Sequence, residues 1–555
     1  MNMILGISLA VTNANSGGAA PTVIYYVDPA GSDAANGLSP ATAWQTLSKV
    51  NGATIPAGAS VLFKGGSTFT GSLNLVEARH YGSSGLITRY GSYGTGRATI
   101  NTTTSTNYGI YAIDPKYVTI ENLIVTGVGR TTSTASGVFL EVLKLASTRL
   151  PAVTLSNVDV SGFGDCGILA WSHPSDSSPS GFDDLTLLNC LVHDCCTTGN
   201  GIFMVSNAYG LKNLAPTFKR TIIRSCKVYD NPGGYASPTS HSGSGILLAQ
   251  TDGALVESCE AYNNGAGNTY AQGPVGIWFY DTTNSIIQFC ESHHNKTGLG
   301  TSDGDGFDLD GGCQNCTVQY CYSHDNYGQG YQLYQYNDPT NILSLTGNTI
   351  RYCISENDCQ QNTATKGAFL LGSADNTRAC SGNAIYGCTV FNSTASANAV
   401  YIFSNPNQFA TSYVGNNIFY LTGASSKFIL SSTSTAPALL FIGNCYSSPA
   451  TSIKWGATTY TTFSNWRAAF PTQETVAGGA TFKAANPSLV GTVPVGTIGG
   501  FDPLLLGAYK TQAASVCKNG GQDLNALYGI SMGSRDLFGN TIPQGLYDIG
   551  CYETA

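Results

Sequence analysis

The stretch IIQFCESHHN (residues 286–295) repeats a pattern found in IIRSCKVYDN (222–231), LVESCEAYNN (255–264) and TVQYCYSHDN (317–326). Each unit has a short apolar run, a cysteine, an alternating run and a closing asparagine. The cysteine recurs in the same frame at Cys190, Cys226, Cys259, Cys290, Cys321, Cys353 and Cys388, with gaps of 36, 33, 31, 31, 32 and 35 residues. Asparagine fills the frame outside this range, at Asn122, Asn157, Asn417 and Asn444. Eleven units with a mean period of about 32 residues predict a solenoid.

The units are typical of strands, because they are short alternating segments rich in Val, Ile and Tyr and bounded by Asn and Gly. Only 10% of the 555 residues are charged, and 66 are glycine, which excludes a coiled coil or a helical bundle. Each repeat places its strand beside the equivalent strand of the repeat before it, so the chain must coil. The equivalent strands then pair in parallel ladders about 4.8 Å apart. The predicted class is therefore all-β, a parallel β-helix of about eleven coils.

The interior of each coil is predicted from the same frame. A ladder of identical small residues is the simplest account of the seventeen cysteines, so we expect free thiols inside the solenoid and no disulfide framework. Five residues after the frame cysteine stand Asn231, Asn264, Asn295 and Asn326. We expect these residues to form an asparagine ladder at a tight turn with left-handed geometry, with Cys195 in the equivalent place of the preceding coil.

A second strand follows a glycine in each coil, as in GIWFY (276–280), GFDLD (306–310), GYQLY (330–334) and GAFLL (367–371). Counted from the glycine, the first and third positions are apolar almost throughout and must face the core, so the second and fourth face outward. The outward pairs are then Trp278 and Tyr280, Asp308 and Asp310, Gln332 and Tyr334, and Phe369 and Leu371. So much outward aromatic surface predicts a face that binds sugars or is covered by loops or a second subunit. Under the first interpretation Trp278, Tyr280, Gln332 and Tyr334 bind substrate.

The segment TSDGDGFDLDGG (301–312) places four carboxylates in eight positions, Asp303, Asp305, Asp308 and Asp310. Asp308 and Asp310 lie two residues apart on one strand, so both project outward, and like charges at this range raise one pKa and separate an acid from a base. We expect Asp308 and Asp310 to be the catalytic pair. Asp305 is expected to tune the pKa of one of them or to replace it, and Asp303 is expected to bind the substrate. Calcium is the alternative, since hard oxygen ligands cluster in this way. We expect no bound metal, because two of the four are spread along a strand.

Two terminal segments carry a resemblance to a known superfamily. YYVDPAGSDAANGLSPATAWQTLSKV (25–50) with IPAGASVLFKGG (55–66) resembles the first strand and capping helix of the right-handed parallel β-helix proteins of the pectin-lyase-like superfamily. SRDLFGNTIPQGLYDIGCYE (534–553) resembles the closing segment of its bacterial carbohydrate-active members. The resemblance implies a right-handed coil, a short helix within residues 43–52, and three parts: an N-terminal extension (1–21), the capped β-helix (22–450) and a C-terminal capping segment (451–555).

The acidic segment resembles two families of that superfamily. DGFD is similar to the NTDGxD segment of polygalacturonase-type glycoside hydrolases, whose first, catalytic aspartate matches Asp305. A pectate-lyase family has DGDGFKLGG, and this sequence has Asp308 in place of its lysine base. The exchange favours hydrolysis over β-elimination. A lyase using Lys366, Tyr334 or a histidine stays open, and Lys366 is expected near the substrate.

The outward side of the cysteine strand carries a second column that includes His193, His293, His324 and Glu356. His324 is the nearest acid–base auxiliary to the aspartates in sequence, and we expect it to contact substrate if it shares their face. The leading hypothesis is an endo-acting, polysaccharide-degrading glycoside hydrolase. A polysaccharide lyase or epimerase is the first alternative. A tailspike or adhesin that binds glycans without cleaving them is the second.

Charge and hydropathy limit the partners and the location. A net charge of −8 without clustered Lys and Arg argues against nucleic acid, and no apolar run reaches the roughly 18 residues that a bilayer span needs. The apolar stretch 4–11 is short and lacks a basic flank, so it predicts neither a signal peptide nor an anchor as it stands. The expected partner is a polysaccharide, the expected location extracellular, secreted or virion-associated, and the expected state a monomer, or a homotrimer for a tailspike.

Overall fold

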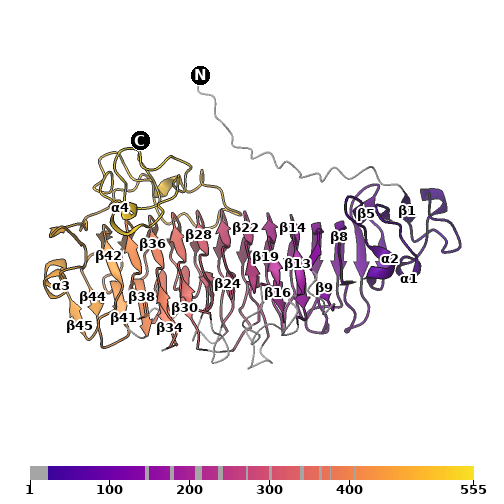
Figure 1. The fold of residues 1–555 in the computed structure, drawn as a ribbon, viewed down its shortest axis with the longest axis horizontal. Helices are drawn as coiled ribbons and strands as arrows, with labels where there is room; N and C mark the ends of the chain where they lie inside the picture. The colour runs from indigo at the N-terminus through magenta and orange to yellow at the C-terminus, as the bar shows by residue number, and fades with distance from the viewer. Residues whose placement is uncertain are drawn as a thin grey trace, which may run out of the picture.

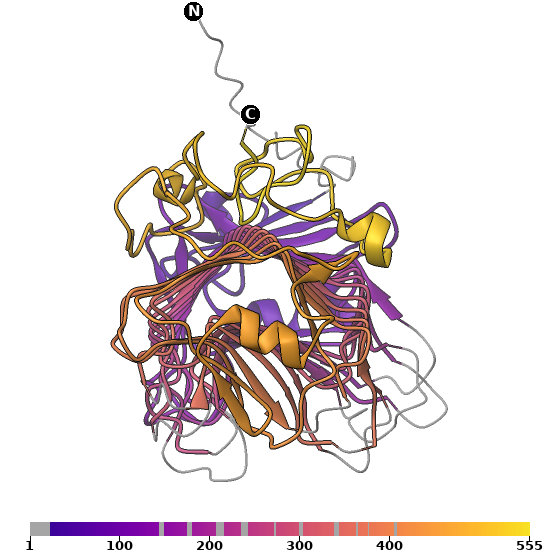
Figure 2. The same cartoon turned by 90° about the vertical axis from the view of Figure 1, so that its left-hand side faces the viewer.

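The computed structural model describes residues 23–554 except 144–148, 175–179, 207–215, 235–241, 271–272, 299–302, 338–342, 362–364, 376 and 405–407. The chain is a right-handed parallel β-helix, drawn out along one axis in Figure 1 and seen nearly end-on in Figure 2. The predicted all-β solenoid of about eleven coils is confirmed.

Two long sheets form the walls of the solenoid. Sheet A contributes two strands to most coils and sheet B contributes one. Sheet A consists of β1 (Ile24–Val27), β2 (Ser60–Lys64), β3 (Thr68–Thr70), β5 (Thr88–Tyr93), β6 (Ala98–Asn101), β8 (Val118–Thr126), β11 (Val153–Ser161), β14 (Thr186–Leu188), β15 (Leu191–His193), β18 (Ile222–Arg224), β19 (Lys227–Tyr229), β22 (Leu255–Glu257), β23 (Glu260–Tyr262), β25 (Ile286–Gln288), β26 (Glu291–His293), β28 (Thr317–Gln319), β29 (Tyr322–His324), β32 (Thr349–Arg351), β33 (Ile354–Glu356), β36 (Ala384–Tyr386), β37 (Thr389–Asn392), β39 (Tyr413–Gly415), β40 (Ile418–Leu421), β42 (Leu440–Ile442) and β43 (Cys445–Ser447).

Sheet B consists of β4 (Leu73–Val76), β7 (Ile110–Ile113), β9 (Val138–Val142), β12 (Ile168–Ser172), β16 (Ile202–Ser206), β20 (Ile246–Ala249), β24 (Val275–Tyr280), β27 (Asp305–Leu309), β30 (Tyr331–Gln335), β34 (Phe369–Ser373), β38 (Asn398–Ser404), β41 (Lys427–Ser431), β44 (Ile453–Trp455) and β45 (Thr458–Tyr460). Three small sheets contain β10 (Arg149–Pro151), β13 (Gly181–Asp183), β17 (Phe218–Lys219) and β21 (Thr251–Asp252); β31 (Leu345–Thr346) and β35 (Cys380–Ser381); and β46 (Thr475–Val476) and β47 (Gly479–Ala480). The helices are η1 (Pro40–Thr42), α1 (Leu47–Gly52), α2 (Glu77–His80), α3 (Phe463–Ala469), η3 (Gly507–Tyr509) and α4 (Leu524–Tyr528).

The cysteine frame faces the interior, as predicted. All seventeen cysteines are buried free thiols. The ladder thiols also satisfy backbone carbonyls; Cys259 Sγ, for example, donates to Ile223 O at 3.6 Å in the preceding coil. A small side chain with a weak S–H donor therefore fits each rung without a disulfide.

The asparagine ladder is confirmed, but the left-handed geometry predicted for its residues is not. Each Nδ2 donates to the Oδ1 of the next rung, from Asn231 to Asn264 at 3.1 Å, Asn264 to Asn295 at 3.1 Å and Asn295 to Asn326 at 3.0 Å. The ladder ends on Asp358, which accepts from Asn326 at 2.8 Å. The left-handed residue is not the ladder asparagine but the one before it, at Asp230, Asn263, His294 and Asp325.

The two ends of the solenoid are closed by short helices. The expected N-terminal helix is α1, which begins after Thr46; the Thr46 hydroxyl accepts the Lys49 N–H at 3.1 Å, and Leu47 and Val50 are buried. At the other end α3 lies across the last coil, and Trp466 packs on Trp455 with ring centroids 5.3 Å apart. Both caps cover apolar edges that would otherwise meet water.

The C-terminal segment, residues 484–554, runs along the outer face of sheet A (Figures 1 and 2). It extends well back from the last coils: the backbone N–H of Ile498 donates to Glu291 at 2.9 Å, and Lys227 Nζ donates to Gly499 O at 2.9 Å. Within the described residues, no helix has the length and apolar character needed to cross a membrane.

One register prediction is wrong. Phe369 pairs with the inward Tyr331 and Leu371 with the inward Leu333, so both face the core. The outward residue beside Gln332 is Leu370. The frame shifts by one because Ala368, and not Gly367, occupies the position of Gly330; Tyr331 N–H donates to Ala368 O at 3.0 Å.

Candidate active site

The predicted acidic segment lies on the outer face of sheet B, in strand β27. Asp308 stands between Trp278 of β24 and Gln332 of β30 in the parallel register. Asp310 follows the strand, and its N–H donates to Phe279 O at 2.9 Å. The structure thus brings the aspartates and Gln332 together on one face, as the alternation of the strand predicts.

Asp308 is the central carboxyl of the cluster and only 2% exposed. Its Oδ2 accepts from Gln332 Nε2 at 3.0 Å, and its Oδ1 has no hydrogen-bond partner among the described residues. Burial, followed by the charges of Asp310 and Asp305, raises the pKa of Asp308 well above its usual range. Burial and neighbouring like charges both favour the protonated form of this carboxyl.

Asp310 is half-buried, and so is its neighbour Tyr334. Asp310 Oδ1 accepts the N–H of Gly311 at 2.7 Å. Burial raises the pKa of Asp310 as well, and the charge of Asp303 adds to the effect. Because water reaches Asp310 and an N–H donor faces it, Asp310 carries a negative charge more easily than Asp308.

Asp305, the first residue of β27, and Asp303, which precedes the strand, complete the cluster. Asp305 is fully buried, and its Oδ1 accepts the Gln329 N–H at 2.7 Å. A Cβ on Gly328 would lie 1.8 Å from that oxygen, so glycine makes room for the carboxyl. Of the two roles predicted for Asp305, tuning or replacing one of the pair, its surroundings favour tuning. Asp305 is fully buried, and its charge contributes to the raised pKa of Asp308.

Lys366 balances part of this negative charge. Its Nζ donates to Asp303 O at 2.7 Å, and the side chain is 3% exposed. Burial raises the pKa of Asp303, and the Lys366 ammonium opposes the shift. Lys366 therefore reaches the cluster, as expected, but contacts the protein backbone and does not project toward solvent.

Trp278 and Tyr280 do not form the expected open surface for sugar stacking. They are 4% and 8% exposed and pack with Leu247, Ala249 and Val275 in one apolar cluster on the outer face of sheet B. The burial of the two rings leaves little aromatic surface for a sugar at this position. Tyr334 and Phe403 on the same face are more open, with ring centroids 6.2 Å apart.

His324 does not share the face of the aspartates, which corrects its assignment to the substrate site. It lies on β29 in sheet A, fully buried, with Nε2 3.1 Å from Glu291 and Nδ1 2.9 Å from Asp325. The C-terminal segment covers this column: Gly500 N–H donates to Glu291, and Tyr509 donates to Glu356. Sequence spacing placed His324 near the cluster, whereas the coil directs it to another wall.

The side chains that come within 4.8 Å of one another as possible metal ligands also lie on sheet A. Within the part of the chain that the structure describes, they form three groups: His293, His294 and His324; Glu260, Glu291 and His293; and His324, Asp325 and Glu356. The hydrogen bonds already made by His324 and Glu291 use the same atoms.

Gln329 is a site residue that the sequence analysis did not name. Its backbone N–H holds Asp305, and its Nε2 donates to Gln332 Oε1 at 2.9 Å, which orients the amide that donates to Asp308. The signal was present in the sequence, because Gln329 precedes Gly330 as Asp305 precedes Gly306.

Residues 145–379 match the family described as "Right handed beta helix region". No curated protein matches the sequence. Among solved structures the chain is similar to GH136 lacto-N-biosidase from Eubacterium ramulus, with 18% identity and a TM-score of 0.49 over 73% of this chain; the match spans 65% of the length of that chain. It is also similar to pectate lyase Pel9A, with 14% identity and a TM-score of 0.42 over 97% of this chain and 99% of that one.

A third similar structure is the A-module of the mannuronan C-5 epimerase AlgE4 from Azotobacter vinelandii, with 14% identity and a TM-score of 0.44 over 72% of this chain and 91% of that module. The family description agrees with the coiled strands of sheets A and B. The chain is thus a right-handed parallel β-helix protein whose sheet B carries a cluster of four carboxyl groups. Two of them, Asp305 and Asp308, each have an oxygen without a hydrogen-bond partner among the described residues.

Proposed function

We propose that the chain is a glycoside hydrolase that cleaves a polysaccharide at Asp308 and Asp310. The observation that carries the proposal is the pair itself: two outward carboxyls on one sheet face. Burial raises the pKa of both, and the charge of Asp310 raises that of Asp308 further. Glycoside hydrolysis needs one carboxyl that holds a proton and one that holds a charge. Cleavage of such a polymer fits action outside the cell, by a secreted or virion-associated protein.

The environments of the two groups assign their roles. Asp308 is the general acid, because it is buried, and it donates its proton to the oxygen of the bond that breaks. Asp310 is the base, because water and the Gly311 N–H reach it, and it takes a proton from the attacking water. Cα atoms two residues apart on a strand are separated by about 6.6 Å, near the lower end of the range of about 6.5–9.5 Å found between carboxyls of inverting enzymes. The side-chain rotamers set the carboxyl separation itself; because the spacing of the pair is nearer the inverting range than the retaining one of about 5–5.5 Å, we propose inversion.

Electrostatics favours hydrolysis over β-elimination at this site. Elimination needs a base that removes the proton next to a uronate carboxylate and a cation that neutralises that carboxylate. The negative charge on Asp310 would repel a uronate, and the Lys366 ammonium is engaged by Asp303 O. A neutral glycan meets neither obstacle.

The test is incubation of the full chain with a panel of neutral and uronate-containing polysaccharides, followed by chromatography of the products and by ultraviolet absorbance for unsaturated uronates. Hydrolysis predicts new saturated reducing ends from at least one glycan and no unsaturated product. Unsaturated products would identify a lyase. Binding without any product would identify a glycan-binding tailspike or adhesin. Either result would refute the proposal.

A further inference from the structure

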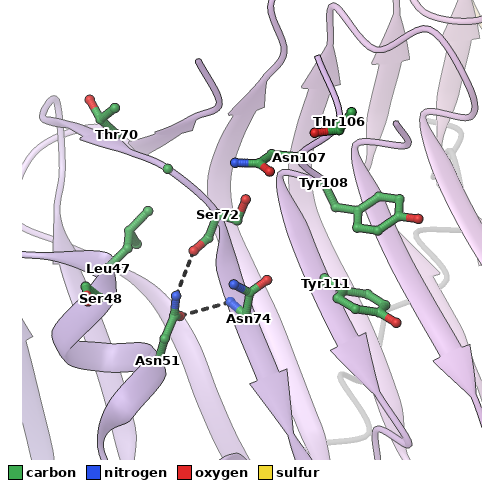
Figure 3. Close-up of a pocket in the computed structure, with 11 residues that line it drawn as sticks. Leu47, Ser48, Asn51, Thr70, Ser72, Asn74, Thr106, Asn107, Tyr108 and Tyr111 are labelled. Atoms are coloured by element: carbon green, nitrogen blue, oxygen red, sulfur yellow. Dashed lines mark hydrogen bonds between the residues drawn. The ribbon is translucent and has the colours of Figure 1, made fainter. Parts of the chain in front are cut away.

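A pocket of about 460 Å³ opens at the N-terminal end of sheet B, far from the aspartates (Figure 3). Helix α1 forms one side, and Asn51 fixes it: Nδ2 donates to Ser72 O at 3.0 Å, and Oδ1 accepts the Asn74 N–H at 2.9 Å. On the other side the rings of Tyr108 and Tyr111 lie next to each other, with centroids 4.9 Å apart. The volume is in the range of small-ligand sites, about 300–1,000 Å³.

The lining has the chemistry of a sugar site. Asn74 and Asn107 expose amide groups, and Tyr108 and Tyr111 are half-exposed rings beside them. Aromatic faces pack against the apolar C–H surface of a sugar ring, while amides and hydroxyls pair with its hydroxyl groups. None of the described lining residues carries a charge.

An acidic group beside the pocket restricts the ligand further. Glu141 accepts from the hydroxyl of Tyr111 and lies 2.9 Å from His173 Nε2, on which Trp171 stacks with ring centroids 5.6 Å apart. A uronate held against Tyr111 would face this carboxylate with no cation among the described lining residues to offset the repulsion. An uncharged sugar would not.

The pocket belongs to the same outward column as the candidate catalytic acid. Asn74, Tyr111 and Phe139 are neighbours in register, and the column continues strand by strand to Trp278 and Asp308. Tyr111 and Asp308 are six strand steps apart, which is about 29 Å at about 4.8 Å per step. An extended glycan that follows the solenoid axis can therefore reach both.

We infer that this pocket binds an uncharged sugar unit of a glycan, remote from the site of cleavage. The inference that the same polymer reaches Asp308 rests on the proposed function; the binding of a neutral sugar by the pocket does not. Together they assign the substrate class as a neutral polysaccharide, not a polyuronate.

The experiment is calorimetric titration of the full chain carrying Asp308→Asn, so that cleavage does not disturb the binding heat. The probes are cellohexaose, mannohexaose and chitohexaose, with hexagalacturonate as the charged comparison. At least one neutral hexasaccharide should bind, and Tyr108→Ala and Asn74→Ala, both in exposed or half-exposed positions, should each weaken its affinity at least about tenfold. Tyr93→Ala is the matched control, a half-buried tyrosine on sheet A that packs on Tyr26, and should leave the affinity unchanged.

The inference is overturned if no neutral hexasaccharide binds, if Tyr108→Ala and Asn74→Ala bind as tightly as their parent, or if hexagalacturonate binds more tightly than every neutral probe. The proposed function fails separately. A wild-type chain that yields no product but binds through Tyr108 would refute hydrolysis and keep the pocket. A chain that hydrolyses its glycan with no loss of binding in either pocket variant would refute the pocket alone.

Discussion

At the scale of single residues, Asp308 and Asp310 differ in how much water reaches them, and this difference separates their roles. Asp308→Asn and Asp310→Asn should each lower kcat by at least about 10²-fold, the lower end for loss of a general acid or base. Thermal unfolding should show an intact fold, since neither carboxyl belongs to the core. Asp230→Asn is the control, an exposed residue with φ of 54° that asparagine tolerates. Wild-type turnover in either cluster variant would exclude the pair.

Calcium remains the alternative use of the four aspartates, and a chelator distinguishes it. We expect EDTA to change neither the activity nor the melting temperature, because Asp308 and Asp310 extend along one strand and Asp305 is held by the Gln329 N–H. Calcium coordination needs about six to eight oxygens at about 2.3–2.6 Å. A fall in melting temperature with EDTA that added calcium reverses would contradict this prediction.

At the scale of the repeat, a ladder asparagine serves two coils at once. Asn264 Nδ2 donates to Val228 O at 3.0 Å and to Asn295, and its Oδ1 accepts from Asn231. Asn264→Ala should lower the free energy of unfolding by about 1–3 kcal/mol, the cost of leaving buried polar partners unpaired. Denaturant titration measures this loss. The exposed Asn525 of α4 is the control, and equal loss in Asn525→Ala would contradict the ladder's role.

The repeat also shows which features of the structure could be predicted from the sequence alone. Period-two alternation placed Asp308, Asp310, Gln332 and Tyr334 on one face, because alternation is a local property of a strand. The shift at Ala368 escaped detection, since Gly367 lies one residue from the frame position. The burial of Trp278 could not be predicted from the sequence either, because the exposure of a side chain depends on what packs above the sheet. His324 shows the same limit: the chain that covers it is about 170 residues away in sequence.

At the scale of the whole molecule, the C-terminal segment is joined to the solenoid through charged groups on sheet A, among them Lys227, Glu291 and Glu356. Glu291 accepts the N–H groups of Ile498 and Gly500, and His324 donates to Glu291 from below. Although burial lowers the pKa of His324, its hydrogen bonds to Asp325 and Glu291 raise it to about 9. Burial raises the pKa of Glu291. The hydrogen bonds from His324 and the two backbone N–H groups lower it by more, so the pKa lies below its usual value.

The docked segment should therefore be sensitive to alkaline pH. A folded-state pKa of about 9 for His324 exceeds the unfolded value of about 6.5. The stabilisation is fully present below about pH 6.5 and is lost as pH rises through about 9. Glu291 has a lowered pKa, so its contribution is present above its unfolded value of about 4.3 and is lost as pH falls below it.

The measurement is the melting temperature of the full chain from pH 5 to pH 10, compared with His324→Gln. The wild type should lose stability between about pH 6.5 and 10, and His324→Gln should be less stable at pH 6 with a flatter profile over that interval. His193→Gln is the matched control. His193 lies in the same column of sheet A, pairs with Asp159 and Asp194, and has a pKa raised to about 8. The stability that His193→Gln removes should therefore be lost about one pH unit below that of His324→Gln. A wild-type profile that stays level from pH 7 to 10, or one that His324→Gln leaves unchanged, would show that the buried imidazole does not hold the C-terminal segment by its charge.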